Sequence, residues 1–555
     1  MFKRNSSFFK RSKKVAEEFL KTVILVDDLA SFEDTPSIEP IDQLAPPPTR
    51  RRGGSRRQTN SADEPSSSSI VKTGESEFDP HQLNAKRVID SFAQKGIVCS
   101  VLRPHENDTT FIHTLRTLAV CADVVIIDWN LHGDDGQKAQ DMIVQVISSP
   151  DTPPSQLRLI VIYTGESDIA GIAQKIKLNL QQKFKNETIR EEERHLTLIL
   201  GANRIVVLAK EGSQVLRAYQ AQVVAFQKLP DRVTDEFTVM THGLVSNVVL
   251  RSLAQIRQKT HKILSQFSSG LDAPYLTHRA LLPQPDDAQE LLVSLLTEEL
   301  HGILEESEVG DEANLEAIRA WLESQAEVED NWWLNLEKND LRISTDRLDA
   351  LMKDGIQKWK IEGLSKNKTK KMKNKPHLLP LTAMFNMNRA EEEALDERFA
   401  YLTTMRSYYS HSSPILTLGT ILKDKQDSSY WVCIQPRCDC VRLKEARSFP
   451  FLPLLTPDKE GRFDVIIKED NSYRRLLCGK KAYQLKLMVF TPGSDQVVKS
   501  LEEQDAFCFK EDGKSYQWLG ELRTEHSLRL SNHFAAMLSR VGLDESEWLR
   551  LWAPK

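Results

Sequence analysis

Five short apolar runs in the first 227 residues constrain the fold of this chain more than any other feature of its sequence. Within each run the apolar residues are consecutive, which is typical of strands that are buried on both faces. Patterns of helical period separate the runs, so we expect parallel strands with helices covering both sides of the sheet. The sequence therefore predicts an α/β domain over 1–227 with a doubly wound, five-stranded parallel sheet. The runs are 23–26, 97–102, 124–127, 159–163 and 204–208.

The segments between these runs carry helix signals. The pair Asp79-Pro80 combines an N-cap residue with proline at the first helical position, and Gly96 ends the apolar stripe that follows. We therefore expect a helix from about 80 to 95. Comparable stripes predict further helices over 109–121, over 136–147, from 167 into a charged extension at 183–195, and over 215–226.

The stretch 31–77 interrupts this domain with a different composition. It is rich in Pro, Ser, Arg and acidic residues, and it includes Pro46-Pro47-Pro48 and four serines from Ser66 to Ser69. Such a composition buries too little apolar surface to offset the entropy lost on ordering. We therefore expect a disordered insertion within the first domain.

Three further regions are expected after the first domain. They are a helical coupling or dimerisation segment over 228–330, a helical region with a lysine-rich linker (366–375) over 331–410, and a mixed β/α domain over 411–555. In the first region, apolar residues spaced by three, four or seven define one helix face. This face is either packed in a core or the seam of a homodimer through 240–267. Its residues are Val245, Val249, Leu253, Ile256, Ile263 and Phe267.

Three cysteines in the C-terminal region allow two interpretations. Cys433, Cys438 and Cys440 have spacings at which thiolates bind zinc, and Cys478 or Cys508 would complete a set of four. Their apolar flanks favour buried cysteines without a metal instead. The strands expected in this region are 430–434, 463–467 and 484–490, and the expected terminal helices are 534–541 and 545–551.

Charge and composition exclude several classes of protein. Lys and Arg number 74 against 79 Asp and Glu, a formal net charge of −5, which excludes a generally basic nucleic-acid binder. No apolar stretch approaches the ~18 residues of a membrane helix. Glu17, Glu18 and Lys21 interrupt the region where a signal peptide would have its apolar centre. Seven cysteines do not suggest a disulfide framework. We therefore expect a cytoplasmic protein for which nucleic acid is an unlikely partner.

Polar side chains follow the ends of four of the five apolar runs. Asp27 and Asp28 follow the first run, Asp128 the third, Thr164 the fourth and Lys210 the fifth. In an open parallel sheet, ligands bind beyond the carboxyl ends of the strands, so we expect these side chains at one place. Three carboxylates repel one another unless a cation lies among them, and oxygen ligands with retained waters suit Mg²⁺. The hydroxyl and the ammonium suit the oxygens of a phosphoryl group.

This set of residues, in this order, resembles the receiver domain of bacterial response regulators, which are two-component signalling proteins with a flavodoxin-like fold. The segment from Asp128 to Gly136 reads Asp-Trp-Asn-Leu-His-Gly-Asp-Asp-Gly and is very similar to the phospho-acceptor segment of chemotaxis-type receivers. The resemblance implies that Asp128 accepts a phosphoryl group from the phosphohistidine of a histidine kinase or phosphotransfer protein. It implies at most an autodephosphorylating activity for the domain.

The same resemblance implies roles for the other residues. Asp27 and Asp28 would hold Mg²⁺, with help from the acceptor aspartate and the backbone carbonyl of Asn130. Thr164 would bind a phosphoryl oxygen and report the change. Lys210 would pair first with the acceptor and then with the phosphoryl group.

The sequence departs from the pattern of this family at four places. One is the long insertion between the first strand and the next helix, which makes the span from Asp28 to Asp128 longer than the family norm. Glu211 stands where the family usually has a proline after the lysine. Leu131-His132 replaces the usual methionine-proline after the acceptor, and Val207 replaces the aromatic residue of the fifth strand. The flip of an aromatic side chain is therefore not expected as the output of the domain.

The resemblance implies a protein that relays or buffers a signal through its C-terminal region by contact with an effector protein. Large receivers with unfamiliar C-terminal regions also occur in bacterial phage-defence signalling. Two alternatives stay open. One is a haloacid-dehalogenase-like phosphatase, which carries its nucleophile on the first strand in an aspartate pair separated by one residue. The other is an effector whose C-terminal region is an enzyme or a nucleic-acid binder.

Overall fold

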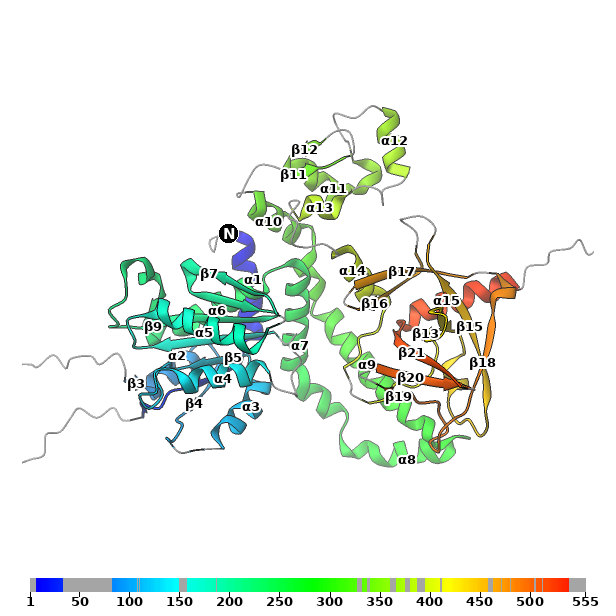
Figure 1. Cartoon of the computed structure of the whole chain (residues 1–555), viewed down its shortest axis with the longest axis horizontal. Helices are drawn as coiled ribbons and strands as arrows, with labels where there is room; N and C mark the ends of the chain where they lie inside the picture. The colour runs from blue at the N-terminus through cyan, green and yellow to red at the C-terminus, as the bar shows by residue number, and fades with distance from the viewer. Residues whose placement is uncertain are drawn as a thin grey trace, which may run out of the picture. The chain divides into compact units, whose positions relative to one another are not determined.

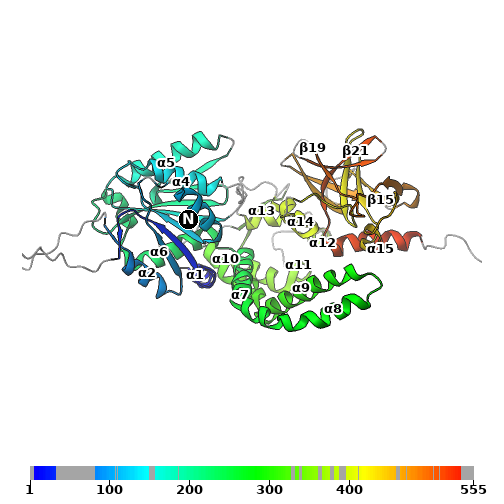
Figure 2. The same cartoon turned by 90° about the horizontal axis from the view of Figure 1, so that it is seen from below.

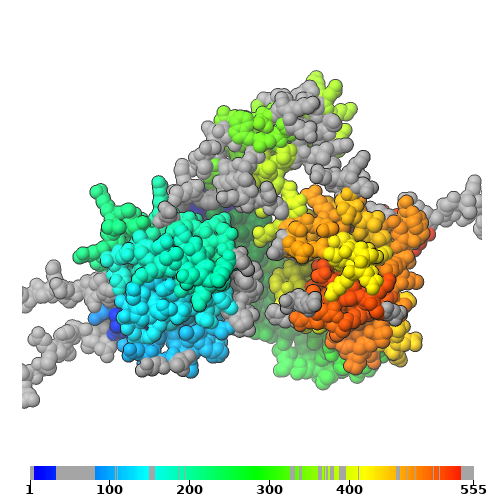
Figure 3. All heavy atoms as spheres, in the orientation of Figure 1, coloured from blue at the N-terminus to red at the C-terminus, as the bar shows by residue number. Residues whose placement is uncertain are grey.

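The computed structural model divides the chain into two compact units, residues 1–329 and residues 330–555. Figure 1 labels their helices and strands, and Figure 3 shows the same view with all heavy atoms drawn. The structure describes 6–32, 82–148 without 107 and 109, 157–326 without 186, 332–336, 340–359, 366–374, 380–386 and 395–538 without 410–411, 458–462, 471, 480, 504–505 and 512.

Unit 1 is built on a sheet in which the five predicted strands lie parallel. These strands are β1 (Thr22–Val26), β4 (Val98–Leu102), β5 (Val124–Ile127), β6 (Arg158–Thr164) and β9 (Asn203–Lys210). Their order across the sheet is β4-β1-β5-β6-β9, and every neighbouring pair is parallel. The doubly wound α/β class predicted from the apolar runs is confirmed.

Helices cover both faces of this sheet, because successive strand residues point to opposite sides. In β1, Ile24 and Val26 belong to one core, and Val23 and Leu25 belong to the other. Three helices pack on the first core, namely α3 (Phe111–Cys121), α4 (Gln137–Ile147) and α5 (Ile169–Lys183). The second core is covered by α1 (Ser7–Phe19), α2 (Ala85–Ala93) and α6 (Leu229–Thr241). The N-terminal helix α1 is an element that the sequence analysis missed.

The helix expected from 80 begins later than predicted, at Ala85. Asn84 caps α2 by accepting the N–H of Arg87 at 2.9 Å, so a cap five residues further along the chain sets the start. Just before it, β3 (Leu83–Asn84) pairs in parallel with β2 (Ala30–Ser31). Asp79-Pro80 and nearly all of the predicted insertion 31–77 lie outside the described residues. The segments just before and just after residues 33–81 therefore lie side by side.

Within its described residues, the charged extension predicted at 183–195 contains no α-helix beyond Lys183. Instead β7 (Ile189–Glu192), a 3₁₀ turn η1 (Glu193–His195) and β8 (Thr197–Leu200) form an antiparallel hairpin that pairs with β9. Thr197 and Leu198 are buried, and ion pairs from Lys177 and Arg204 meet the acidic residues of β7. These contacts outweigh the helix propensity of the acidic run, and the hairpin extends the sheet beyond the five parallel strands.

The helix predicted over 215–226 is also absent from the described residues. The segment forms a 3₁₀ helix η2 (Arg217–Gln222), a short strand β10 (Val223–Val224) and a 3₁₀ turn η3 (Phe226–Lys228). The two β-branched valines pair in parallel with Ala209 and Lys210 at the end of β9. The helix that closes this part of the unit is therefore α6, one segment further along the chain.

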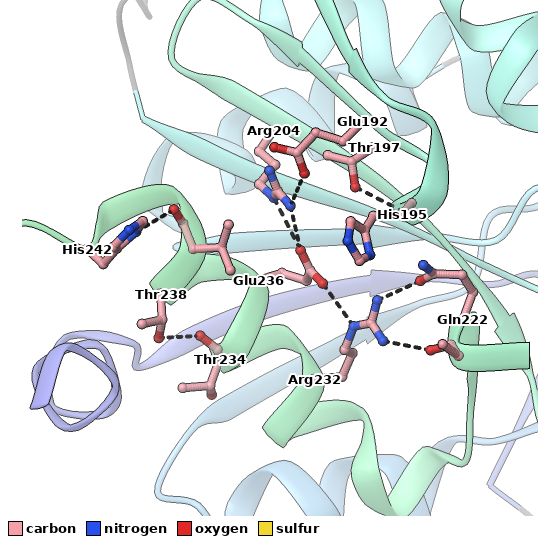
Figure 4. A network of polar contacts seen from close by, with 12 residues as sticks. Glu192, His195, Thr197, Arg204, Gln222, Arg232, Thr234, Glu236, Thr238 and His242 are labelled. Carbon is pink, nitrogen blue, oxygen red and sulfur yellow. Dashed lines mark hydrogen bonds and ion pairs between the residues drawn. The ribbon is translucent and has the colours of Figure 1, made fainter. Parts of the chain in front are cut away.

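A buried polar network ties β9 to α6 and the hairpin (Figure 4). The Arg204 guanidinium donates to Glu236 Oε2 from Nη2 at 2.9 Å and from Nε at 3.2 Å, and Nη2 lies 3.1 Å from Glu192. Arg232 donates to the other Glu236 oxygen at 3.0 Å and to Gln222 at 2.6 Å. Because Glu236 and Arg204 are buried, each charge depends on its partner.

The rest of unit 1 is helical over the described part of the predicted helical segment 228–330. Its helices are α7 (Leu244–Gln266), α8 (Asp272–Leu281), α9 (Ala288–Glu306) and α10 (Leu315–Ala326) (Figure 2). The buried face of α7 carries Leu250 and Ala254, whereas Val245, Val249 and Leu253 of the predicted stripe are exposed. The core interpretation of that stripe is therefore wrong at these three residues, and the homodimer through 240–267 stays a prediction.

Unit 2 begins with a small hairpin, β11 (Trp332–Leu334) and β12 (Leu341–Ile343). Helix α11 (Thr345–Lys358) follows the second strand, and α13 (Leu381–Phe385) packs on β11. Trp332 and Trp359 are buried and give this part of the unit a small aromatic core. The lysine-rich linker predicted at 366–375 is helical over its described part, α12 (Lys366–Asn374).

The larger part of unit 2 is an antiparallel sheet with two cores and two flanking helices. The predicted strands at 430–434, 463–467 and 484–490 are present as β14, β16 and β18. The terminal helix begins earlier than predicted, and 539–555 lie outside the described residues. The elements are α14 (Leu395–Thr404), β13 (Thr420–Asp424), β14 (Tyr430–Cys433), β15 (Arg447–Leu455), β16 (Val465–Glu469), β17 (Ser472–Cys478), β18 (Lys486–Phe490), β19 (Leu501–Glu503), β20 (Ala506–Glu511), β21 (Lys514–Glu521) and α15 (Thr524–Leu538).

The three central cysteines of unit 2 differ in environment. Cys433 lies in β14 and Cys440 in a 3₁₀ turn, and both are buried, whereas Cys438 is exposed. Burial raises the pKa of the Cys440 thiol to about 11, which disfavours the thiolate that a metal needs. Whether these cysteines bind a metal stays a prediction. Within the described residues, no helix is long and apolar enough to cross a membrane.

We predict that Glu236→Ala destabilises unit 1 by about 3 kcal/mol, because the substitution leaves two guanidinium groups without their shared carboxylate and one of them is buried. Hydrogen exchange of the β9 amides, measured by mass spectrometry on the full chain, reports this loss. The control is Asp90→Ala, which breaks the exposed Lys86–Asp90 pair and should cost less than about 1 kcal/mol. If the β9 amides were equally protected from hydrogen exchange in wild type and both variants, the stabilising role of Glu236 would be contradicted.

Candidate functional site

The polar residues that were predicted at the strand ends converge at one edge of the sheet. Asp27 and Asp28 follow β1, Asp128 follows β5, and Thr164 and Lys210 are the last residues of β6 and β9. Each of the five is buried, although all five are polar. Buried polar groups need partners, so the contacts among these side chains define what the site can do.

Lys210 lies at the centre of these contacts. Its ammonium nitrogen is 2.8 Å from Asp27 Oδ2 and 3.0 Å from Asp128 Oδ1, and it lies 5.9 Å from the centre of the Tyr163 ring. Burial alone would lower the pKa of Lys210, but the carboxylates of Asp128 and Asp27 raise it by more. The lysine therefore stays positively charged between two carboxylates.

Asp128 is the most perturbed carboxyl of the site. Burial raises its pKa most, Lys210 lowers it, and Asp27 and Asp28 raise it again, with a resulting pKa of about 6. At neutral pH the group is still mostly ionised, but it is more basic than an exposed aspartate. A more basic carboxylate is a better nucleophile, and Asp128 combines this property with an adjacent cation.

Asp28 is held by the loop that follows the acceptor-like aspartate. Its Oδ2 accepts the backbone N–H of His132 at 2.9 Å and lies 3.3 Å from His132 Nδ1. The other ring nitrogen of His132 is 3.1 Å from the carbonyl oxygen of Pro104, which fixes the orientation of the ring. These contacts use one oxygen of Asp28. Its Oδ1 is buried and has no hydrogen-bond partner within the described part of the chain.

This unpartnered oxygen tests whether the site fits a divalent cation. A buried carboxylate oxygen without a donor is costly, and a bound cation would satisfy it. Within the described residues, no group of three or more His, Cys, Asp and Glu side chains has the arrangement of a complete metal site. Lys210 occupies one oxygen each of Asp27 and Asp128. The residues therefore fit an open site that also uses waters and main-chain carbonyls, as Mg²⁺ prefers.

The loop after β5 is rigid because of Trp129 and Gly136. Trp129 is buried, and Gly136 has φ +85°, a conformation that favours glycine. A Cβ at Gly136 would lie 2.1 Å from the indole ring of Trp129. Asp134 then caps α4 by accepting the N–H groups of Gly136 and Lys138 at 3.1 and 2.7 Å. The glycine eight residues after Asp128 is thus required by packing.

A short chain of polar contacts links Thr164 to the same loop. Thr164 Oγ1 accepts the N–H of Glu166 at 3.2 Å, and the Glu166 side chain accepts the amide of Asn130 at 3.1 Å. The sequence analysis missed the roles of Glu166 and of the Asn130 side chain, and it treated His132 only as a departure from a pattern. The sequence signal for all three was their position two to five residues after a strand end.

The structure shows the local conformation at positions where the sequence departs from the family pattern. The described residues contain no cis peptide bond, so the peptide between Lys210 and Glu211 is trans. Val207 lies in the core under α5. Its side chain is smaller than the aromatic one that the family usually has at this position. Tyr163 lies on the other face of the sheet, and its hydroxyl donates to Val224 O at 2.7 Å.

Residues 19–215 match the model of a protein family described as the response receiver domain. The match includes β1 to β9 and every side chain of the site. It ends before α6, so the helical segment and unit 2 lie outside it. No curated protein and no solved structure matches the chain significantly.

We predict that Gly136→Ala destabilises unit 1 by about 2–3 kcal/mol, because it combines positive-φ strain with a clash against the Trp129 indole. Gly133→Ala is a matched control, since Gly133 also has a positive φ (+74°) but no atom lies within 4 Å of its Cβ position. Its expected cost is about 1 kcal/mol. Urea unfolding of both variants measures the difference, and equal losses would contradict the packing argument.

Proposed function

We propose that the receiver domain formed by residues 19–215 accepts a phosphoryl group on Asp128 and that the rest of the chain transmits this signal by protein contact. A receiver domain supports a response-regulator-like signalling role for the chain. The observation that carries the proposal is the buried cluster in which Lys210 lies within 3.0 Å of both Asp27 and Asp128. The donor is a histidine kinase or a phosphotransfer protein.

Asp128 would act as the nucleophile. One of its carboxylate oxygens forms a bond to phosphorus while the bond between phosphorus and the donor's imidazole nitrogen breaks. The imidazole nitrogen takes the electron pair of that bond, and because the donor ring is protonated on its other nitrogen, the histidine leaves in its neutral form. Such a transfer needs alignment and positive charge near the phosphoryl oxygens more than covalent help from the protein.

Two side chains of the site supply these requirements directly. The Lys210 ammonium exchanges its contact with Asp128 for a phosphoryl oxygen and stays paired with Asp27. Thr164 Oγ1 accepts a backbone N–H, so its own proton is available to donate to another phosphoryl oxygen. When Thr164 moves toward the phosphoryl group, the Glu166 backbone and its contact with Asn130 move with it, which biases a second conformation of the loops.

A divalent cation completes the proposed site. Receiver domains generally bind Mg²⁺ where they are phosphorylated, and the buried Asp28 Oδ1 supports such binding here. Asp27, Asp28, Asp128 and the backbone carbonyl of Asn130 would hold the ion. When bound, it supplies positive charge that offsets the charge of the transferring oxygens.

The phosphatase alternative receives less support from the site. A haloacid-dehalogenase-like enzyme would place its nucleophile after the first strand, where Asp27 is paired with Lys210. Here the carboxylate with the raised pKa is Asp128, after a different strand. An enzymatic or nucleic-acid-binding output of unit 2 has no specific observation in its favour.

We predict that the full chain, mixed with acetyl phosphate and Mg²⁺, gains one phosphoryl group that hydroxylamine removes, as expected for an acyl phosphate. Asp128→Asn should abolish the gain, because an amide is not a nucleophile. Asp135→Asn is the matched control, since Asp135 is exposed in the same loop and pairs only with Lys175 within the described residues. Intact mass spectrometry measures all three proteins.

Two outcomes would contradict the acceptor assignment. One is a wild-type chain that gains no phosphoryl group under these conditions. The other is a phosphoryl group that persists in Asp128→Asn.

We further predict that His132→Ala weakens cation binding by about 10- to 100-fold, because it removes the imidazole nitrogen 3.3 Å from Asp28 Oδ2 and leaves the backbone N–H as the contact of residue 132 with this carboxylate. Electron paramagnetic resonance with Mn²⁺ as the probe measures the affinity without any phosphoryl transfer. His105→Ala, an exposed histidine of the neighbouring loop, should leave the affinity unchanged. Equal affinities of wild type and His132→Ala would show that Asp28 needs no such support.

A further inference from the structure

Tyr163, the residue before Thr164 in β6, is a buried aromatic side chain beside the site. Only 3% of its surface is exposed, and it belongs to the core that α1, α2 and α6 cover. Because neighbouring residues of a strand point to opposite faces, Tyr163 and Thr164 leave the end of β6 in different directions. The phosphoryl transfer proposed above uses Thr164 but leaves Tyr163 without a role.

The face of the Tyr163 ring lies against the ammonium group of Lys210. The nitrogen is 5.9 Å from the ring centre, within the ~6 Å at which the face of an aromatic ring attracts a cation. This attraction is stronger where water is removed, and both side chains are buried. The ring therefore holds the same ammonium that pairs with Asp27 and Asp128.

The hydroxyl of Tyr163 holds the backbone beside Lys210. It donates to Val224 O at 2.7 Å, and Val224 pairs with Lys210 in the parallel ladder of β10 and β9. Burial raises the pKa of Tyr163, and the charges of Glu211 and Asp27 raise it further, so the phenol stays protonated and able to donate. One side chain thus contacts both the ammonium of Lys210 and the strand next to its backbone.

Strand β10 has only two residues and depends on side-chain contacts of this kind. Arg232 of α6 donates to a backbone carbonyl two residues before the strand at 2.9 Å. Ser91 Oγ of α2 lies 3.3 Å from a backbone carbonyl oxygen two residues after it. Tyr163 supplies the contact at β10 itself, so its hydrogen bond is the one nearest to Lys210 among these three.

Phosphoryl transfer requires the ammonium to change partners while it stays in place. In the proposed reaction Lys210 exchanges its contact with Asp128 for a phosphoryl oxygen. A lysine has a flexible four-carbon stem, so an ammonium that exchanges a partner needs other contacts to keep it aligned. The contact with the Tyr163 ring involves none of the reacting oxygens, and it is retained during the exchange.

We propose that Tyr163 is a positioning residue for the phosphoryl transfer, because its ring holds the ammonium of Lys210 and its hydroxyl holds the strand beside the Lys210 backbone. The inference rests on the proposed function, since it concerns the rate of the same transfer. The divalent cation would be held by carboxylates and a main-chain carbonyl and not by Lys210. Loss of Tyr163 should therefore slow the transfer and leave the affinity for the cation unchanged.

The test compares Tyr163→Phe and Tyr163→Leu with wild type, each as the full chain. Phenylalanine keeps the ring but loses the hydrogen bond to Val224, so the rate of phosphorylation by acetyl phosphate at saturating Mg²⁺ should fall about threefold. Leucine loses both contacts, and the rate should fall by about tenfold or more. Intact mass spectrometry measures the rates. Electron paramagnetic resonance should give both variants an affinity for Mn²⁺ within about twofold of wild type.

Ser91→Ala is the matched control, since it removes a contact beyond the end of β10 and leaves both contacts of Tyr163 in place. Its rate should equal that of wild type. The position of the ammonium is read directly from the reaction of Lys210 with acetic anhydride, measured relative to exposed Lys175 by peptide mass spectrometry. In Tyr163→Leu this reaction should rise by about fivefold or more, because removal of the ring opens space beside the ammonium.

Three outcomes would overturn the inference. The first is an equal rate of phosphorylation in wild type and Tyr163→Leu. The second is an affinity for Mn²⁺ that falls together with the rate, since a general loss of structure at the site would then explain both. The third is an equal reaction of Lys210 with acetic anhydride in wild type and Tyr163→Leu. If wild type itself gains no phosphoryl group, the proposed function fails instead, and the reaction of Lys210 still decides whether Tyr163 positions the ammonium.

Discussion

One buried ammonium group determines how the carboxyl edge of the sheet is organised. Lys210 lies between Asp27 and Asp128, and all three side chains are removed from water. Two carboxylates at this distance would otherwise repel each other and take up protons. The arrangement is possible because three strands of a parallel sheet end at the same level, and because β10 pairs with Ala209 and Lys210 and so holds the backbone that carries the ammonium. The chemistry of the site is therefore inseparable from the topology of the sheet.

The sequence predicted those features of the fold that rest on burial. Consecutive apolar residues at 124–127 and 159–163 are typical of strands buried on both faces, so the sequence predicted the central strands and their parallel direction. The hairpin formed by β7 and β8 could not be predicted in the same way. Its residues are mostly charged, and they are strands only because β9 offers an edge and Lys177 and Arg204 offer partners. Similarly, Val223 and Val224 join the sheet through a contact with β9 that no local pattern reveals.

The candidate site was predictable to the same extent. The rule that strand ends meet at one edge located Asp27, Asp28, Asp128, Thr164 and Lys210 correctly. The same rule does not predict which neighbouring residues hold these side chains in place by hydrogen bonds. That His132 holds Asp28, or that Glu166 links Thr164 to Asn130, depends on loop conformations with positive φ and on contacts across the edge. The exposure of Val245, Val249 and Leu253 on α7 could not be predicted either. The helical period of the apolar residues identifies one face of the helix, but it does not show whether another element covers that face.

The pairing of β2 with β3 has a consequence for how this domain can change over time. Ala30 lies beside Leu83, only two residues after the aspartate pair that begins the site. Chain that leaves a fold and re-enters it at adjacent positions can be lengthened, shortened or replaced without displacing either end. The stretch between them is thus free to acquire new sequence while Asp27 and Asp28 keep their positions. Insertions of different length and sequence can therefore be accommodated beside the site without displacing the aspartate pair.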